Sequence, residues 1–529
     1  MESIAGRIIL LWGWRRMALA FLAGALGVLA LPPFDFPAVC FVSFPVLVWL
    51  LDGAASDGTG GFLRRLWPSF VTGWWFGFGW FVAGLWWVGQ ALLVEAGAHA
   101  WAMPFAIVGL PAVLALFYGL AAALARIGWR DDLGRILALA AAFGAAEWLR
   151  SVAFTGFPWN AVGYAAAPVP LLMQSVKWTG FFGLCALAVF LFALPALAGG
   201  RNWRKTGALL ALLLAAAHGG YGWWALQAPP SGTPAQTVVV RLVQPSIDQA
   251  EKWDAARRGE IFRTYLDMTA KAPEAGKPVP QLIIWPETAV PWLITERPEV
   301  LTAIGEVLDE NQILLTGAVR SEGEVKTGDA RFYNALVAIN GAGEIADAAD
   351  KVHLVPFGEY LPFAHVFRLF GIESIVAGPG SFSAAPSHKL LELPGLPKIL
   401  PLICYEVIFP GEVARSARGA GLVVNLTNDA WYGDTPGPYQ HLRAAQLRAV
   451  ELGLPMLRAA NNGISAAIDS RGRLLDALAL DSVAAVDIAI NLENSEMEGG
   501  VQPLNTVFII LALGLMSLIL GLFGRYRAN

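Results

Sequence analysis

The sequence predicts a polytopic α-helical membrane domain with eight spans and an α/β domain inserted before the last span. Composition is the first observation: 56% of the 529 residues are hydrophobic and 15% are charged, which is too apolar for an ordinary soluble enzyme. Charge distribution is the second. Residues 1–235 carry 13 Lys/Arg and 8 Asp/Glu, whereas residues 236–500 carry 22 and 33. The first part is typical of a membrane domain, and the second of an acidic globular domain.

The spans are predicted from runs of about 20 mostly apolar residues, the length that crosses a bilayer. Seven of them form a membrane domain over residues 1–227, and an eighth follows the α/β domain. Seventeen of the 21 tryptophans precede residue 228, as expected for aromatic belts at the bilayer interfaces. The predicted spans are 14–31, 38–52, 69–93, 102–125, 135–151, 178–199, 206–227 and 506–523.

Basic residues in the loops predict the orientation of these spans. Every second loop is basic, whereas the loops on the other side hold only Arg150 and Lys177. By the positive-inside rule, both termini are cytoplasmic and the inserted domain lies outside. In a Gram-negative cell that side is the periplasm, so we expect a multi-pass protein of the bacterial inner (cytoplasmic) membrane. The basic loop residues are Arg7, Arg15, Arg16, Arg64, Arg65, Arg126, Arg130, Arg135, Arg201, Arg204, Lys205, Arg525 and Arg527.

Glu147 and Arg150, in Glu147-Trp-Leu-Arg150, lie at the end of the fifth predicted span. One interpretation is an interfacial pair whose long side chains reach water. The other is a polar contact to the outer domain or to a lipid headgroup. Because charges at span ends are common, we favour the interfacial pair.

The outer domain is predicted over residues 237–498, after a Pro/Gly-rich linker at 228–236. Strand-like runs alternate there with helix-like polar segments at 250–270, 297–310 and 439–453, which indicates a layered α/β domain. The strand-like runs are 237–243, 281–285, 312–318, 333–339, 399–404, 421–426 and 464–469.

Several classes of function are disfavoured by charge and by cysteine usage. The outer domain has a net charge near −11, whereas nucleic-acid binding needs a basic surface. No metal-ligand spacing such as Cys-x-x-Cys is present, so neither a metal nor another cofactor is expected. Cys40 and Cys185 lie in apolar segments and are interpreted as inert small hydrophobic residues. The remaining cysteine, Cys404, lies in the polar half of the chain.

Three residues of the outer domain could together perform nucleophilic acyl chemistry, and each lies beside a strand-like run. Glu287 follows Trp285-Pro286 and could act as a general base, Lys351 could donate to an oxyanion, and Cys404 ends the run 399–404. Taken singly, each has a simpler explanation: a loop glutamate, a surface lysine and a buried structural cysteine. Glu359, eight residues after Lys351, could hold the amine by a hydrogen bond.

The order and surroundings of these residues match a known arrangement. Trp285-Pro-Glu287, then Lys351-Val-His-Leu-Val-Pro-Phe-Gly-Glu-Tyr360, then Cys404-Tyr-Glu406 resembles the Glu–Lys–Cys triad of the nitrilase superfamily. The membrane-embedded branch, apolipoprotein N-acyltransferase, resembles this chain over nearly its whole length. Further matching motifs are Thr155-Gly-Phe-Pro-Trp-Asn160, Thr427-Asn-Asp-Ala-Trp-Tyr-Gly433, Pro438-Tyr-Gln-His-Leu442 and Arg458-Ala-Ala-Asn-Asn-Gly463.

The resemblance implies a nitrilase-like αββα sandwich and a two-step acyl transfer. Glu287 would deprotonate Cys404, which attacks the sn-1 ester of a phospholipid, commonly phosphatidylethanolamine. Lys351 and the backbone N–H of Tyr405 would stabilise the oxyanion, leaving a thioester on Cys404. The α-amine of a diacylglyceryl-cysteine at the N-terminus of an apolipoprotein would then take the acyl group. The resemblance also assigns importance to Tyr405 and Glu406. Trp253, in Ala250-Glu-Lys-Trp253, matches a tryptophan with a role in the family or is an indole that packs a helix, and Trp253 and Trp431 are both candidate substrate-binding residues.

Residues 361–377 hold too many bulky apolar groups for a solvated loop. Phe363, Val366, Phe367 and Phe370 fall at helical spacing, which gives one apolar face. This face could pack in the core, but because both substrates would be lipids, we favour an interfacial arm that enters the outer leaflet.

Two other functions compete with acyl transfer. A membrane-tethered carbon-nitrogen hydrolase of the amidase or nitrilase type would use the same triad, although it would need neither eight spans nor an apolar arm. A transporter or scaffold with an inactive outer domain would be expected to carry ionisable residues in mid-span, and the predicted spans hold almost none.

Overall fold

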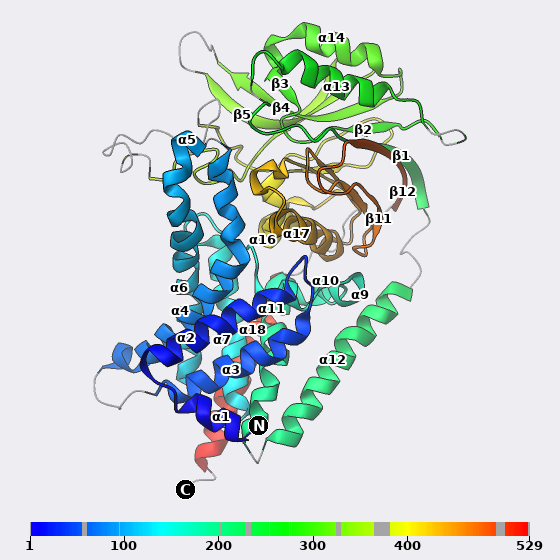
Figure 1. Cartoon of the computed structure of the whole chain (residues 1–529). Helices are drawn as coiled ribbons and strands as arrows, with labels where there is room; N and C mark the ends of the chain where they lie inside the picture. The colour runs from blue at the N-terminus through cyan, green and yellow to red at the C-terminus, as the bar shows by residue number, and fades with distance from the viewer. Residues whose placement is uncertain are drawn as a thin grey trace. The chain divides into compact units, whose positions relative to one another are not determined.

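A computed structural model describes residues 2–55, 61–94, 96–200, 203–227, 234–252, 254–273, 276, 278–323, 330–363, 365, 381–493 and 503–526 (Figure 1). The chain divides into two compact units. The first is Met1–Gly89, Pro104–Ala228 and Val501–Asn529, and the second is Gln90–Met103 and Pro229–Gly500. Each is described by itself below.

The first unit is helical. Each of the eight predicted spans overlaps one long helix, although the bounds differ by up to eight residues, and shorter helices connect them. The long helices are α2 (Gly13–Gly27), α3 (Cys40–Gly53), α4 (Phe62–Leu85), α6 (Leu110–Ala125), α7 (Leu133–Val152), α11 (Phe181–Ala193), α12 (Arg204–Gln227) and α18 (Pro503–Tyr526). The short helices are α1 (Glu2–Ile9), α8 (Val162–Ala165), α9 (Pro170–Met173) and α10 (Val176–Thr179).

The count of eight spans is not confirmed. Within the described ranges, five helical stretches are long and apolar enough to cross a membrane. Two more apolar stretches, Pro37–Gly53 and Asn505–Leu520, are shorter, and α7 carries three charged residues. The five stretches are Gly13–Ala30, Phe62–Leu93, Ala100–Gly128, Phe181–Gly199 and Arg204–Gln227.

Close packing of α4 against α6 depends on glycine. A Cβ added at Gly73 would lie 2.4 Å from the Cβ of Ala122 and 2.6 Å from the carbonyl oxygen of Tyr118. A Cβ added at Gly77 would lie 2.8 Å from the Cβ of Tyr118. Small residues at such positions let two helix backbones approach closely. In lipid, where the hydrophobic effect does not drive helices together, such close van der Waals packing lets apolar helices associate.

The prediction that Glu147 and Arg150 reach water is wrong. Both side chains are buried inside the helical unit, with exposed fractions of 0% and 1%. Arg150 Nη2 lies 2.5 Å from Glu147 Oε2, and Glu147 Oε1 accepts from the Tyr118 hydroxyl at 2.7 Å. Arg150 also donates to the carbonyl of Trp159 at 2.9 Å. The loop after α7 folds back over the helix end, so the pair is covered by the protein's own chain.

The second unit contains two β-sheets that pack face to face (Figure 1). The first has the strand order β12-β1-β2-β4-β5-β6, with β3 also paired to β4, and the second has the order β11-β10-β9-β8-β7. The first sheet comprises β1 (Pro234–Gln244), β2 (Leu282–Ile284), β3 (Val290–Leu293), β4 (Ile313–Glu322), β5 (Arg331–Asn340), β6 (Ile345–Asp350) and β12 (Ala484–Glu493). The second comprises β7 (Ile399–Ile403), β8 (Leu422–Thr427), β9 (Met456–Ala460), β10 (Ala466–Ile468) and β11 (Leu474–Ala477).

Apolar side chains from both sheets form the central core, including Val240, Ile284, Ile403 and Leu426. Helices cover the outer faces: α13 (Arg258–Ala270) and α14 (Pro298–Val307) lie on the first sheet, and α16 (Pro410–Ser416) and α17 (Pro436–Leu452) on the second (Figure 1). A short helix, α5 (Ala96–His99), belongs to the other segment of this unit. The layers therefore follow the αββα order that the resemblance implies.

Candidate active site

Glu287, Lys351 and Cys404 lie at the ends of three strands that meet in the core of the second unit. Glu287 comes three residues after β2, and Lys351 directly follows β6. Cys404 directly follows β7 and begins a short 3₁₀ helix, η10 (Cys404–Ile408). All three are buried, with exposed fractions of 6%, 1% and 5%. The strand ends thus bring together a carboxylate, an ammonium and a thiol from distant parts of the sequence.

Glu287 is held by polar partners at its carboxylate. Its Oε1 accepts from Asn334 Nδ2 at 2.8 Å and lies 3.5 Å from Lys351 Nζ. The backbone beside it is fixed as well, because Trp285 N–H donates to the carbonyl of Leu315 in β4 at 2.9 Å. A carboxylate in this position can take a proton from a neighbouring acid.

Lys351 is paired with two carboxylates. Its Nζ donates to Glu359 Oε1 at 2.9 Å, in addition to its contact with Glu287. Burial alone would lower the pKa of Lys351, but Glu359 and Glu287 outweigh it and raise the pKa above its usual value. The ammonium therefore stays charged near neutral pH and can stabilise a negative oxygen.

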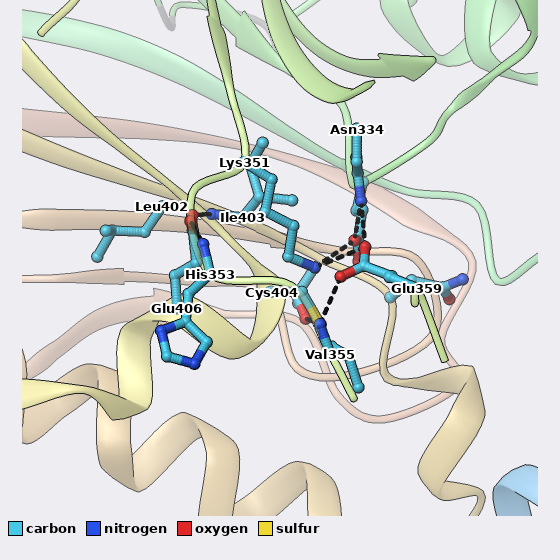
Figure 2. Close-up of polar contacts among 12 residues, drawn as sticks. Asn334, Lys351, His353, Val355, Glu359, Leu402, Ile403, Cys404 and Glu406 are labelled. Atoms are coloured by element: carbon cyan, nitrogen blue, oxygen red, sulfur yellow. Dashed lines mark hydrogen bonds and ion pairs between the residues drawn. The ribbon is translucent and has the colours of Figure 1, made fainter. Parts of the chain in front are cut away.

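The predicted hydrogen bond between Glu359 and Lys351 is confirmed, and the carboxylate has two further partners. Glu359 Oε1 also accepts from Asn334 Nδ2 at 3.0 Å, and Oε2 accepts from the N–H of Val355 at 2.8 Å (Figure 2). Asn334 thus bridges Glu287 and Glu359. Asn334 was not among the residues predicted from the sequence. Its position inside the apolar run of β5 is nevertheless a signal, because a buried amide needs hydrogen-bond partners.

Cys404 adopts an unusual backbone conformation, with φ +53°. This left-handed region is rare for residues with a side chain, and such strain is concentrated at functional sites. The hydroxyl of Thr427 lies 3.2 Å from Sγ. Burial and the charge of Glu287 raise the pKa of Cys404 to about 12, while Lys351 lowers it. The resting site therefore holds a thiol, which needs a base to become a nucleophile.

Glu406 ties the strand of the cysteine to the strand of the lysine. Its Oε2 accepts from the N–H of Ile403 at 2.6 Å, and its Oε1 accepts from the N–H groups of Val352 and His353 at 2.7 and 2.9 Å (Figure 2). Burial alone would raise the pKa of Glu406, but His388 and these N–H groups lower it. Glu406 is therefore an anionic clamp between Cys404 and Lys351. Tyr405 is buried beside it and packs edge-on against Phe409.

A second buried network supports the backbone of Cys404. His441 Nε2 lies 3.2 Å from the Cys404 carbonyl oxygen, and its Nδ1 lies 2.8 Å from Asp429 Oδ1. Arg458 Nη2 donates to Asp429 Oδ2 at 2.7 Å. Burial would raise the pKa of Asp429, but Arg458 and His441 lower it to about 2. These residues belong to motifs quoted above, yet the sequence assigned them no role.

The predicted substrate-contact residues are only partly described. Trp431 is half-buried in the 3₁₀ helix η11 (Asp429–Tyr432), next to this network. Phe363 is 64% exposed and has φ +54°. Trp253, Phe367 and Phe370 lie outside the described residues, as does most of the predicted arm. Among the residues that are described, no group of three or more His, Cys, Asp or Glu side chains could hold a metal ion.

Comparison with known proteins shows the family of this chain. Residues 239–494 match the carbon-nitrogen hydrolase family, and residues 23–194 match the apolipoprotein N-acyltransferase N-terminal domain. An apolipoprotein N-acyltransferase of Rhizobium rhizogenes is 53% identical over 523 residues, which cover 98% of this chain and 98% of the relative. The chain belongs to the apolipoprotein N-acyltransferase family.

Other relatives carry the same name. The apolipoprotein N-acyltransferase of Brucella suis is 53% identical, with coverage of 100% of this chain and 99% of the relative. That of Rhizobium leguminosarum is 54% identical, with 96% coverage of both. Among solved structures, Nit3 of Saccharomyces cerevisiae, a member of branch 10 of the nitrilase superfamily, is similar with a TM-score of 0.35 and 18% identity, covering 50% of this chain and 92% of that chain.

Proposed function

We propose that this chain N-acylates the N-terminal diacylglyceryl-cysteine of apolipoproteins, the final step of bacterial lipoprotein maturation. The acyl donor is the sn-1 ester of a phospholipid, with phosphatidylethanolamine the preferred candidate. The observation that carries the proposal is the buried gathering of Glu287, Lys351 and Cys404 in a chain whose other unit is a set of apolar helices. Full-length relatives named for this activity support it.

In the first half-reaction, Glu287 takes the thiol proton of Cys404, and the thiolate attacks the ester carbonyl carbon. The resulting oxyanion is stabilised by the Lys351 ammonium and by the backbone N–H of Tyr405. When the intermediate collapses, the glycerol oxygen leaves and takes the proton back from Glu287. A lysophospholipid departs, and a thioester remains on Cys404.

In the second half-reaction, the α-amine of the apolipoprotein attacks the thioester carbonyl. Glu287 receives a proton from the amine, the thiolate leaves, and protonation regenerates the thiol. A thiolate leaves far more readily than an alkoxide, so dividing the transfer at a thioester makes amide formation from an ester feasible. Each step balances with the donor, the acceptor and these side chains alone.

We further propose that the helical unit spans the bacterial inner membrane eight times. Both termini would be cytoplasmic and the domain over 237–498 periplasmic. The alternation of basic loops supports this orientation. The overlap of one long helix with each predicted span supports the count.

Substrate contacts are proposed for Trp253, Trp431, Phe363, Phe367 and Phe370. The exposure of Phe363, at 64%, supports an apolar arm, because a bulky side chain in that position would otherwise face water. The half-buried Trp431 lies two residues from Asp429, whose network reaches the nucleophile. An arm of this kind would enter the outer leaflet beside the site.

Intact mass spectrometry tests the proposed function against the carbon-nitrogen hydrolase alternative. Purified protein incubated with phosphatidylethanolamine vesicles should gain one acyl mass that hydroxylamine removes and that Cys404→Ala lacks. Addition of a diacylated lipopeptide should discharge the adduct and increase the mass of the peptide by the same amount. Release of ammonia from small amides, with no adduct from phospholipid, would support the alternative instead.

A further inference from the structure

Lys252 is a buried cation beside the triad that the reaction above does not use. It lies in the segment that follows β1, and its exposed fraction is 2%. Its Nζ donates to the backbone carbonyl oxygen of Glu287 at 3.0 Å. Among the described residues this is the only hydrogen bond of the ammonium, which has three N–H donors. Burying a charged lysine beside a single neutral acceptor is costly, so its presence calls for a reason.

The segment that carries Lys252 is fixed to the second sheet. The side chain of Asn461, which follows β9, accepts from the N–H of Ile247 at 3.0 Å and donates to the Ile247 carbonyl at 2.8 Å. Gln249 accepts from Asn428, which follows β8. The backbone around Lys252 is therefore anchored to the second sheet, which carries Cys404. Its side chain reaches from there to Glu287, which follows β2 of the first sheet.

The backbone at Glu287 is itself strained and tightly packed. Thr288 has φ +48°, a conformation that residues with side chains rarely adopt. On the β4 side, a Cβ added at Gly317 would lie 2.4 Å from the Thr288 nitrogen and 2.6 Å from the Glu287 Cα. The turn is thus pressed against β4, and Lys252 holds the Glu287 carbonyl of the same turn.

The site also holds more negative than positive charge, so a second cation would help to balance it. Lys351 is the ammonium that contacts both Glu287 and Glu359, so one positive charge faces two carboxylates. Ionisation of Cys404 adds another negative charge. Burial lowers the pKa of Lys252 to about 8, and the charges of Glu287 and Cys404 oppose this by raising it.

We propose that Lys252 is a positioning residue for acyl transfer: its ammonium fixes the carbonyl of Glu287 and supplies the second positive charge beside the Glu287–Cys404 pair. The inference rests on the proposed function, because it assumes that Glu287 is the base that deprotonates Cys404. Lys252 touches the base through the backbone and takes no part in bond making.

Three substitutions separate the hydrogen bond from the charge. Lys252→Gln keeps an N–H donor but removes the charge, Lys252→Met removes both, and Lys252→Arg keeps both in a larger group. The matched control is Lys271→Met, because Lys271 is an exposed lysine in the same domain. Each variant is purified as the full chain, and the rate of acyl-adduct formation on Cys404 from phosphatidylethanolamine is followed by intact mass across pH 5 to 9.

Lys252→Met should slow acylation on the order of 10²-fold, because a small displacement of a catalytic group has effects of that size. The acidic limb of its pH–rate profile should move to higher pH, since the carboxylate of the base loses a positive neighbour that favours its ionised form. Lys252→Gln should show the same shift of the limb with a smaller loss of rate. Lys252→Arg should recover part of the rate and return the acidic limb of the profile to its position in the parent protein. Lys271→Met should match the parent protein in both.

A role in folding alone would predict a different pattern. The melting temperature would fall, and the rate per folded molecule and the pH profile would stay as in the parent protein. That result in Lys252→Gln, which is the mildest change, overturns the proposal while leaving the triad mechanism intact. A parent protein that forms no Cys404 adduct overturns the proposed function and this inference together, so the two failures are distinguishable.

Discussion

At the scale of single residues, the surroundings of Cys404 keep it as a thiol, and we propose that Glu287 removes its proton during the reaction. The pKa of Cys404 is raised to about 12 by burial and by Glu287, so very little thiolate exists near neutral pH. Lys351 favours the thiolate, and Thr427 can donate to the sulfur when it becomes negative. The reactivity of Cys404 therefore depends on its neighbours.

Cys404→Ser should abolish acyl transfer while preserving the fold, because a serine hydroxyl is a much weaker acid than a thiol and the site offers no other base matched to it. We expect a loss of at least about 10³-fold, as is usual when the nucleophile of a catalytic unit is replaced. The measurement is the mass adduct from phospholipid, with the melting temperature as the control for folding. Substantial transfer by a stably folded Cys404→Ser protein would rule out the thioester mechanism.

Glu287→Gln and Lys351→Met should each remove most activity, and the double substitution should cost little more than the worse single one. Both side chains are buried around one carboxylate–ammonium contact of 3.5 Å, and residues that act as one unit are strongly non-additive. The measurement is a double-mutant cycle, in which the acylation rates of the parent protein, the two single variants and the double variant are compared. If the two losses multiplied, the residues would be serving separate steps.

At the scale of elements, β8, β9 and α17 together support the backbone of Cys404 through Asp429, which follows β8. The Asp429 carboxylate accepts a hydrogen bond from Arg458 and lies beside His441, which contacts the carbonyl oxygen of Cys404. Its pKa is lowered to about 2 from a usual value of 3.8. A carboxyl group with a depressed pKa in the folded state contributes stability above its unfolded pKa, and that stability is lost as the pH falls through the folded value.

Asp429→Asn should therefore destabilise the protein by about 2 kcal/mol at pH 7, corresponding to a shift of nearly two pKa units. The difference from the parent protein should disappear between about pH 4 and pH 2, where the parent loses the same interaction. Denaturant unfolding of both proteins across this range measures it. The control is Asp476→Asn, an exposed aspartate on β11 of the same sheet. An equal difference at pH 7 and pH 2 would contradict the assignment.

The three candidate residues could be picked out from the sequence because each lies in a motif, and Glu287 and Cys404 also follow apolar strands, β2 and β7. The supporting residues were harder to predict. Asn334, Asp429 and Lys252 are ordinary polar residues whose partners are distant in the sequence, so their roles depend on how the two sheets pair. Glu147 and Arg150 were misinterpreted for the same reason, because their burial comes from a loop that folds back after α7.

At the scale of the whole molecule, the orientation in the membrane is the largest prediction that depends on sequence alone. Charge in the loops predicts it, because basic loops resist translocation. Two exposed glycines provide matched positions for a test. A Cβ added at Gly61, before α4, or at Gly259, in α13, would meet no atom within 4 Å, so cysteine fits at both.

A membrane-impermeant maleimide applied to intact spheroplasts should label Gly259→Cys and leave Gly61→Cys unlabelled, because we place α13 in the periplasm and the loop before α4 in the cytoplasm. Cys40, Cys185 and Cys404 are buried, so the parent protein serves as the blank. Lysis before labelling should make Gly61→Cys react as fully as Gly259→Cys, which shows that it is accessible in itself. Labelling of Gly61→Cys before lysis, with Gly259→Cys protected, would mean that the catalytic domain faces the cytoplasm. In that orientation the domain could not reach a lipoprotein on the outer leaflet, so the proposed substrate would be wrong along with the topology.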